Sequence, residues 1–172
     1  MNEAHWVFGY GSLIWRQDFP YRDSRPAHIE GWCRRFWQGS HDHRGVAYDP
    51  GRVVTLIESP GELCHGRAFL IETTVFAHLD HREKNGYERQ DIEIHFADSD
   101  ADGVTYVAPA ENHAFLGDAP LHQMVAQIRR CAGESGSNLE YVLELARALR
   151  QLDADDSHVF EIEALVMEQH CG

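Results

Sequence analysis

Two stretches of this 172-residue chain hold residues that can do chemistry. In the first, WVFGYGSLIW (residues 6–15), Gly9, Gly11 and Ser12 come directly after an apolar, strand-like run. Because glycine leaves the backbone bare where the strand ends, the peptide N–H groups near Ser12 and Leu13 can hold a carboxylate or a polarised carbonyl oxygen. The alternative is a purely structural turn between core strands, eased by glycine.

Known glycine-loop motifs do not fit this run. A dinucleotide-binding G-x-G-x-x-G/A motif needs glycine or alanine where Ile14 stands, and the chain lacks the G-K-[ST] of a P-loop. A nucleophile elbow G-x-S-x-G around Ser12 needs glycine in place of both Tyr10 and Ile14, so a serine hydrolase is disfavoured. The functional interpretation that remains is a small turn that binds an anion or a carbonyl group.

The second stretch centres on Glu83. Phe76, Leu79 and Glu83 follow i, i+3, i+7 spacing, which predicts a helix that turns this carboxyl group inward. Partial burial and the negative end of the helix dipole should both raise its pKa, which suits a general base near neutral pH. Alternatively, Glu83 points to solvent or pairs with a neighbour such as Arg82 or Lys84.

Other candidates are weaker. Tyr141 follows Asn138 by three residues, in the predicted first turn of a helix, where it can bind substrate or serve as an ordinary core tyrosine. The histidines of HDHRG (41–45) and the pair Cys64-His65 raise the question of a metal, but no H-E-x-x-H or C-x-x-C motif is present. We therefore predict no metal site, and surface or hydrogen-bonded roles for these residues.

The elements that must position these residues divide into an early strand-rich part and a helical C-terminal third. Extended, β-branched or aromatic runs predict strands at 6–10, 34–39, 52–58, 66–72, 89–97 and 104–109. Apolar spacing predicts helices that start near Thr74, near Pro120, at Asn138 and at Ser157, with threonine, asparagine and serine as caps. The pattern predicts an α+β domain around a curved or closed sheet.

Length and charge limit the class of protein. A chain of 172 residues is expected to form one domain, 1–172, with a single core. The net charge of −13 disfavours nucleic acid and anionic membrane surfaces as partners. No apolar run approaches the roughly 20 residues that span a bilayer, and the absence of a leading apolar segment favours the cytoplasm. The sequence leaves the oligomeric state open.

Several segments together resemble a known family. In order and spacing, the chain from about Trp6 to about Val166 resembles the ChaC-type γ-glutamylcyclotransferases, the glutathione-specific kind, through the segments VFGYGSLIW, RRFWQGSHDHRG, GRVVTLIE, LDHREKNGY and SGSNLEYVLELA. The resemblance implies a small mixed β-barrel flanked by helices and conversion of the substrate glutathione to 5-oxoproline and cysteinylglycine. It implies no metal or organic cofactor.

By position, the resemblance also implies roles for individual residues. It makes Glu83 the catalytic residue and assigns the substrate-binding loop to Gly9, Tyr10, Gly11, Ser12, Leu13 and Ile14. The chain departs from the family pattern at Phe115, where tyrosine is frequent, and at Ser137, where arginine is common. Two alternatives stay open: a cyclotransferase for other γ-glutamyl amides, and a non-catalytic module that binds γ-glutamyl compounds.

Overall fold

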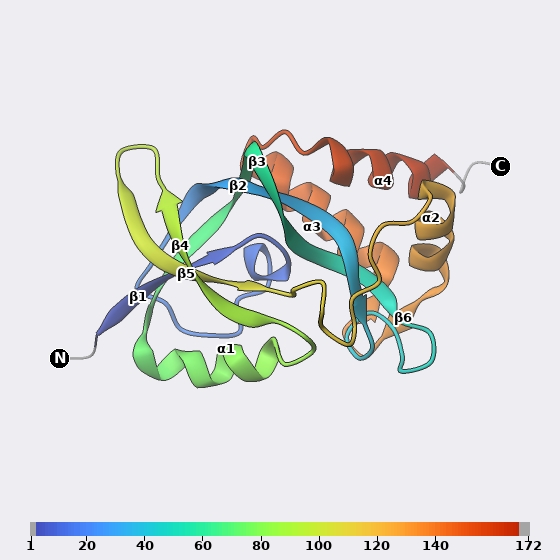
Figure 1. Cartoon of the computed structure of the whole chain (residues 1–172), viewed down its shortest axis with the longest axis horizontal. Coiled ribbons are helices and arrows are strands. Elements are labelled where there is room, and N and C mark those ends of the chain that lie inside the picture. The colour runs from blue at the N-terminus through green and yellow to red at the C-terminus, as the bar shows by residue number, and fades with distance from the viewer. Residues whose placement is uncertain (1–2, 169–172) are drawn as a thin grey trace.

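Five strands close into a barrel in the computed structural model, which describes residues 3–168 (Figure 1). The strands follow the order β1-β3-β2-β4-β5, with antiparallel neighbours except where β1 pairs in parallel with β5. Their bounds are Ala4–Gly9 (β1), Asp23–Ser40 (β2), Gly51–Glu72 (β3), Glu88–His95 (β4) and Asp100–Val107 (β5). The predicted α+β class and mixed barrel are confirmed.

Strands β2 and β3 are much longer than the sequence predicts. The predicted strands at 52–58 and 66–72 are two halves of β3, and β2 begins at Asp23, ahead of the predicted 34–39. The β2–β3 register shifts between the pairs Glu30–Leu63 and Trp32–Glu58. Gly31 and Gly61 lie at this irregularity with positive φ angles of 84° and 90°, which only glycine adopts freely. The long hairpin therefore bends without ending.

Two hydrophobic clusters lie on opposite faces of β1. Phe8 and Tyr10 pack toward the helical layer, with Trp6 partly buried beside them, as their alternation predicts. Val7, between them in sequence, packs instead into a second cluster with Leu79. The chain that leaves β1 therefore emerges between the two clusters, and the functional residues gather there.

Helices cover two sides of the barrel. The short α1 (Phe76–Arg82) packs under β1, whereas α2 (Leu121–Arg130), α3 (Asn138–Gln151) and α4 (Ser157–Glu168) form a layer on another side (Figure 1). The two-residue strands β6 (Ala132–Gly133) and β7 (Gly136–Ser137) pair between α2 and α3. This arrangement brings the end of α1 and the start of α3 toward the end of β1.

The predicted cap of α3 is wrong by one residue. Ser137, not Asn138, is the N-cap, and its hydroxyl accepts a hydrogen bond of 3.0 Å from Glu140 N. The Asn138 side chain is fully buried and bonds both the N–H (2.7 Å) and the carbonyl (2.8 Å) of Arg52 on β3. Asn138 thus fastens the start of α3 to the barrel instead of capping the helix.

Two other predicted caps are also wrong. The Asp156 carboxylate accepts from Val159 N at 3.1 Å at the start of α4, a role that the sequence assigned to Ser157. Before α1, residues Thr73–Val75 form a turn of 3₁₀ helix, and the Thr73 hydroxyl donates to Glu3 O instead of capping the helix. These helices begin where tertiary contacts place them.

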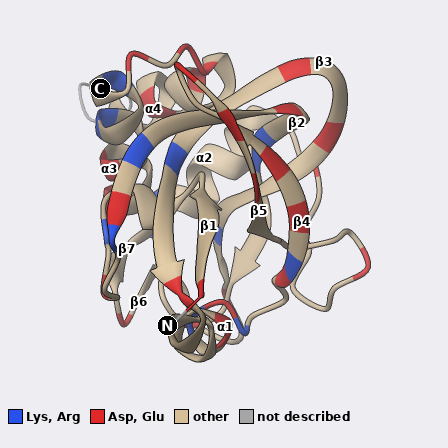
Figure 2. Ribbon diagram, turned by 90° about the vertical axis from the view of Figure 1, so that its left-hand side faces the viewer, with Lys and Arg blue, Asp and Glu red and all other residues tan. Residues whose placement is uncertain are grey.

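The surface carries the acidic excess of the sequence. Figure 2 shows Asp and Glu on the long strands and on the helical layer, with fewer Lys and Arg between them. Across residues 3–168, none of the helices combines the length and apolar character needed to cross a membrane.

Candidate active site

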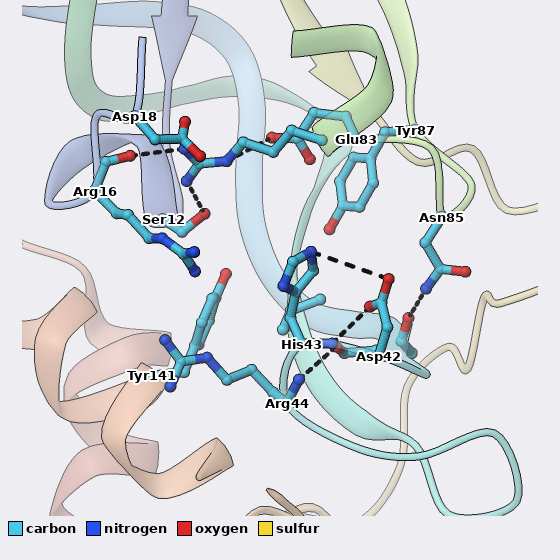
Figure 3. A pocket seen from close by; sticks show the side chains of 14 residues that line it. Ser12, Arg16, Asp18, Asp42, His43, Arg44, Glu83, Asn85, Tyr87 and Tyr141 are labelled. Carbon is cyan, nitrogen blue, oxygen red and sulfur yellow. Dashed lines mark hydrogen bonds and ion pairs between the residues drawn. The ribbon is translucent and has the colours of Figure 1, made fainter. Parts of the chain in front are cut away.

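Two pockets that share the lining residues Ser12, Glu83, Tyr87 and Tyr141 form one cavity, which brings together most of the residues predicted to bind substrate. Its narrow part is lined by Tyr10, Gly11, Ser12 and Leu13 after β1, by Glu83 after α1, and by Tyr141 in α3. A wider part continues from Ser12, Glu83 and Tyr141 toward residues of the segment after β2 (Figure 3). Gly9 and Ile14 do not line either part: Gly9 ends β1, and Ile14 packs in the core.

The turn after β1 offers unpaired donors to this cavity. Residues Ser12–Ile14 form a single turn of 3₁₀ helix, in which Ile14 N donates to Gly11 O at 3.0 Å. Within residues 3–168, the N–H groups of Gly11, Ser12 and Leu13 donate to no protein oxygen. Since the three residues line the narrow part, these groups are available to hold a carboxylate or carbonyl oxygen there.

Gly11 has little room for a side chain, because Tyr141 and Val54 lie close to its backbone. A Cβ atom at Gly11 would lie 3.1 Å from the Tyr141 hydroxyl and 3.1 Å from Cγ2 of Val54. Both distances are tighter than ordinary van der Waals contact, so a larger residue would displace Tyr141 or the turn. This close approach supports the structural interpretation of the glycine, and its role in substrate binding stays a prediction.

Glu83 faces inward at the end of α1. Its N–H donates to Leu79 O at 2.9 Å, and Leu79 and Phe76 on the same stripe are buried, as predicted. Its side chain is 17% exposed. Burial, together with the charges of Asp18 and Asp42, raises its pKa to about 7 against the opposing effect of Arg82. At neutral pH this carboxyl group can both accept and release a proton.

Arg82 is engaged with other partners, which explains why it makes no hydrogen bond with Glu83. Its Nη1 donates to Asp18 at 2.6 Å and to Arg16 O at 2.8 Å, and its Nη2 donates to Ser12 Oγ at 3.0 Å. Its Nε lies 3.9 Å from the Glu83 carboxylate, beyond a hydrogen bond. Arg82 thus orients Ser12, and a guanidinium cannot act as the base that a serine nucleophile requires.

Two tyrosines present opposite hydrogen-bonding polarity to the cavity. The Tyr87 hydroxyl donates to Val54 O at 2.7 Å, which leaves its oxygen able to accept. The Tyr141 hydroxyl accepts from Val54 N at 3.2 Å, and its own proton has no acceptor among the described residues. Burial raises the pKa of Tyr141 to about 12 and that of Tyr87 well above its usual value, so both stay protonated.

Several lining residues were not singled out from the sequence. HDHRG was predicted to hold surface or hydrogen-bonded residues, and three of its members, Asp42, His43 and Arg44, line the wide part. Further polar residues that line it are Arg16, Asp18, Ser40, Asn85 and Tyr87. Most of them stand inside or just after the motifs quoted for the family resemblance. Their position in or next to these motifs is the sequence signal that could have identified them.

Two clusters have the donor types of a metal site. Asp42, His43 and Glu134 each place one donor atom within 4.8 Å of the others at the mouth of the cavity. Glu93, His95 and Asp100 do the same on the barrel surface. Each cluster includes at least one exposed carboxylate, and exposed acidic groups are common without a metal, so the expectation of no metal site stays a prediction.

Comparisons with known proteins agree with this geometry. The family model described as ChaC-like protein matches residues 5–169. A glutathione-specific γ-glutamylcyclotransferase 1 of Danio rerio is 37% identical, over 94% of this chain and 88% of the relative. A glutathione-specific γ-glutamylcyclotransferase of Schizosaccharomyces pombe is 40% identical, over 95% of this chain and 93% of the relative.

A solved structure extends the likeness to three dimensions. The crystal structure of a γ-glutamyl cyclotransferase specific to glutathione from yeast superposes with a TM-score of 0.89, at 27% identity and with 97% of each chain covered. A second solved structure, described as a γ-glutamyl cyclotransferase, shares the fold at a TM-score of 0.52 and 16% identity. On the family match and these relatives, the chain belongs to the ChaC-like protein family.

Proposed function

We propose that this protein is a glutathione-specific γ-glutamylcyclotransferase, which releases 5-oxoproline and cysteinylglycine from glutathione. The observation that carries the proposal is the position of Glu83: a mostly buried carboxyl group with a pKa of about 7, in one cavity with the bare turn at residues 10–13. The relatives named glutathione-specific γ-glutamylcyclotransferases support the choice of substrate.

The reaction needs no nucleophile from the protein. In a γ-glutamyl amide, the α-amine can reach its own γ-carbonyl carbon and close a five-membered ring. Such tethered attack has an effective molarity on the order of 10⁵ M or more when the reacting atoms are aligned. The first task of the cavity is therefore to hold the glutamyl chain in its folded, reactive conformation.

Glu83 moves the protons. The α-nitrogen carries three hydrogens in glutathione and one in 5-oxoproline, whereas the leaving nitrogen changes from one hydrogen to three. Ionised Glu83 takes a proton from the α-ammonium group, the freed amine attacks, and protonated Glu83 delivers the proton to the leaving nitrogen as its bond to carbon breaks. A second proton follows the same route. Glu83 ends the cycle ionised, as it began.

The other cavity groups fit the charges of the substrate. The unpaired N–H groups of Gly11, Ser12 and Leu13 hold the α-carboxylate of the glutamyl group. The Tyr87 oxygen accepts from the α-ammonium group, and the free proton of Tyr141 faces the charge that develops on the γ-carbonyl oxygen. Each role uses a hydrogen-bonding position that the folded protein leaves open.

The proposal is tested by incubating the purified protein with glutathione in the presence of EDTA and measuring 5-oxoproline by mass. We expect 5-oxoproline and cysteinylglycine in equal amounts. Parallel reactions with γ-glutamyl dipeptides and γ-glutamyl-lysine separate the alternatives. Faster turnover of one of these would identify a cyclotransferase for other γ-glutamyl amides, and binding of glutathione without product would identify a binding module.

The proposal places this reaction in the cytoplasm. Cys33, Cys64 and Cys131 are free thiols in the structure. Free thiols are typical of a reducing compartment. Retention of activity in a strong excess of reductant, at the level measured without it, is the expected result.

A further inference from the structure

The wide part of the cavity contains a buried cation with unused donors. The Arg44 side chain is 7% exposed. Its Nη1 donates to Ser137 O at 3.0 Å and lies 3.4 Å from the Glu140 carboxylate. Its Nε and Nη2 have no hydrogen-bond partner anywhere in residues 3–168, and both belong to a residue that lines the cavity. A buried guanidinium with two open donors is suited to an anion.

The surroundings of Arg44 keep these donors positioned. Its guanidinium carbon lies 5.7 Å from the centre of the Tyr141 ring, and Figure 3 shows the two side chains together on the same side of the cavity. The side chain of Glu140, its acidic neighbour, is 56% exposed, so solvent screens that pair. Arg44 therefore keeps much of its attraction for a second, less exposed anion.

The position of Arg44 decides which part of the substrate it meets, if the proposed function holds. The narrow part holds the glutamyl group, because the α-amine must reach Glu83 beside the turn at Gly11. Arg44 lines the wide part and is absent from the narrow one. The leaving peptide must occupy the wide part, since the two parts meet at Glu83 and Tyr141.

A dipeptide leaving group ends in a carboxylate within reach of the wide part. Two extended residues span on the order of 7 Å, and the guanidinium fork matches a carboxylate in both shape and charge. We propose that Arg44 binds the free C-terminal carboxylate of the leaving peptide. The enzyme thereby selects γ-glutamyl peptides with an ionised C-terminus over those in which that charge is masked.

The first arm of the test changes the substrate and leaves the protein intact. Glutathione and its glycyl monoethyl ester share the γ-glutamyl-cysteinyl part and differ in the C-terminal charge. We expect kcat/KM for glutathione to exceed that for the ester about tenfold or more, the effect of one charge-assisted hydrogen bond. Equal kcat/KM values for the two substrates would overturn the proposal.

The second arm changes Arg44. In Arg44→Gln, KM for glutathione should rise about tenfold while KM for the ester stays the same, so the preference disappears. Arg44→Lys keeps the charge but lacks the planar guanidinium, so it should show a reduced preference. This variant replaces Arg44→Gln in the test if the glutamine variant does not fold. Arg150→Gln, an exposed arginine of α3 outside the cavity, should keep the full preference.

Three outcomes would contradict the proposal. An equal loss with both substrates in Arg44→Gln would mean that Arg44 binds the glutamyl half. Loss of the preference in Arg16→Gln, with Arg44→Gln unchanged, would assign the carboxylate to Arg16 at the cavity mouth. A full preference in Arg44→Lys and Arg44→Gln would remove the subsite.

A binding measurement separates this proposal from the proposed function. Glu83→Gln should bind both ligands without turnover, so calorimetric titration with glutathione and with the ester reports the carboxylate subsite alone. About tenfold tighter binding of glutathione supports the subsite even if no 5-oxoproline is formed, and equal binding overturns it. Absence of 5-oxoproline with intact binding would contradict the cyclotransferase function only.

Discussion

The raised pKa of Glu83 is due to its burial among other side chains. An exposed glutamate is fully ionised at neutral pH, whereas burial here raises its pKa from 4.5 to about 7. Above its ordinary pKa the unfolded chain has already lost this proton, while the folded protein still holds it. The contribution of Glu83 to stability therefore decreases as the pH rises from 4.5 to about 7.

This linkage gives a prediction for stability. Glu83→Gln removes the cost of a buried charge, so the variant should be more stable than the parent at pH 8, by up to about 3 kcal/mol. Near pH 4 the two should be nearly equal, because Glu83 is protonated there. Urea denaturation at both pH values measures the difference. The exposed Glu88→Gln is the control, and a pH-independent difference for Glu83→Gln would contradict the assigned pKa.

The two tyrosines give a prediction for kinetics. In the proposed mechanism, Tyr141→Phe removes the donor to the γ-carbonyl oxygen, so kcat should fall about 10- to 100-fold. Tyr87→Phe removes the proposed acceptor for the substrate ammonium group and should act mainly on KM. Steady-state rates for both variants decide this assignment. An effect of Tyr141→Phe on KM alone would place its hydroxyl outside the transition-state contacts.

At the scale of elements, the helix starts show what local sequence can and cannot predict. The sequence placed the caps at Asn138 and Ser157, since both residue types cap helices well. The fold instead uses Asn138 to bond both backbone groups of Arg52, and this tertiary contact moves the cap to Ser137. Likewise, β2 pairs with both halves of β3, so β3 continues through the gap between the predicted strands 52–58 and 66–72.

The cap assignments are testable. Ser137→Ala should lower the free energy of unfolding by about 1 kcal/mol, because Glu140 N loses its acceptor. Ser157→Ala should change it by less than about 0.5 kcal/mol, since the Asp156 carboxylate performs the capping there. Denaturant titrations of the two variants compare them directly. A larger loss in Ser157→Ala than in Ser137→Ala would reverse the assignment.

At the scale of the whole molecule, Arg34 connects the barrel, the turn and the helical layer. Its side chain is 1% exposed and donates to Tyr10 O at 2.7 Å, to His65 O, and to Asp156 at 3.0 Å. These acceptors belong to the turn directly after β1, to β3 and to the segment before α4. One buried guanidinium thus holds the turn of the candidate site against two layers of the fold.

Arg34→Met should therefore be strongly destabilising. The change leaves the Asp156 carboxylate and the carbonyl groups of Tyr10 and His65 without this donor, and breaking a buried ion pair costs about 3–5 kcal/mol. Arg25→Met, at an exposed arginine paired with Asp23, should cost less than about 0.5 kcal/mol. Urea denaturation of both variants provides the comparison. Equal stabilities would show that Arg34 does not connect these layers.

The sequence predicted the local parts of the site better than their assembly. Glu83 could be found because helical spacing turns it inward, and the turn after β1 could be found because glycines follow an apolar strand. The convergence of Arg44, Tyr87 and Tyr141 could not be found from spacing, since β-barrel closure brings together residues far apart in the chain. The proposed roles of Tyr87 and Tyr141 depend on which of them donates to Val54 and which accepts from it, and these contacts exist only in the folded protein.

In the proposed mechanism, Glu83 relays protons between the attacking and leaving nitrogens of the substrate. The most direct test measures 5-oxoproline release from glutathione by Glu83→Gln, with Glu88→Gln as the matched control and calorimetry to verify binding. We predict that Glu83→Gln binds glutathione normally while kcat falls by roughly 100-fold or more, and that Glu88→Gln matches the parent. Near-normal release of 5-oxoproline by Glu83→Gln would contradict this role of Glu83.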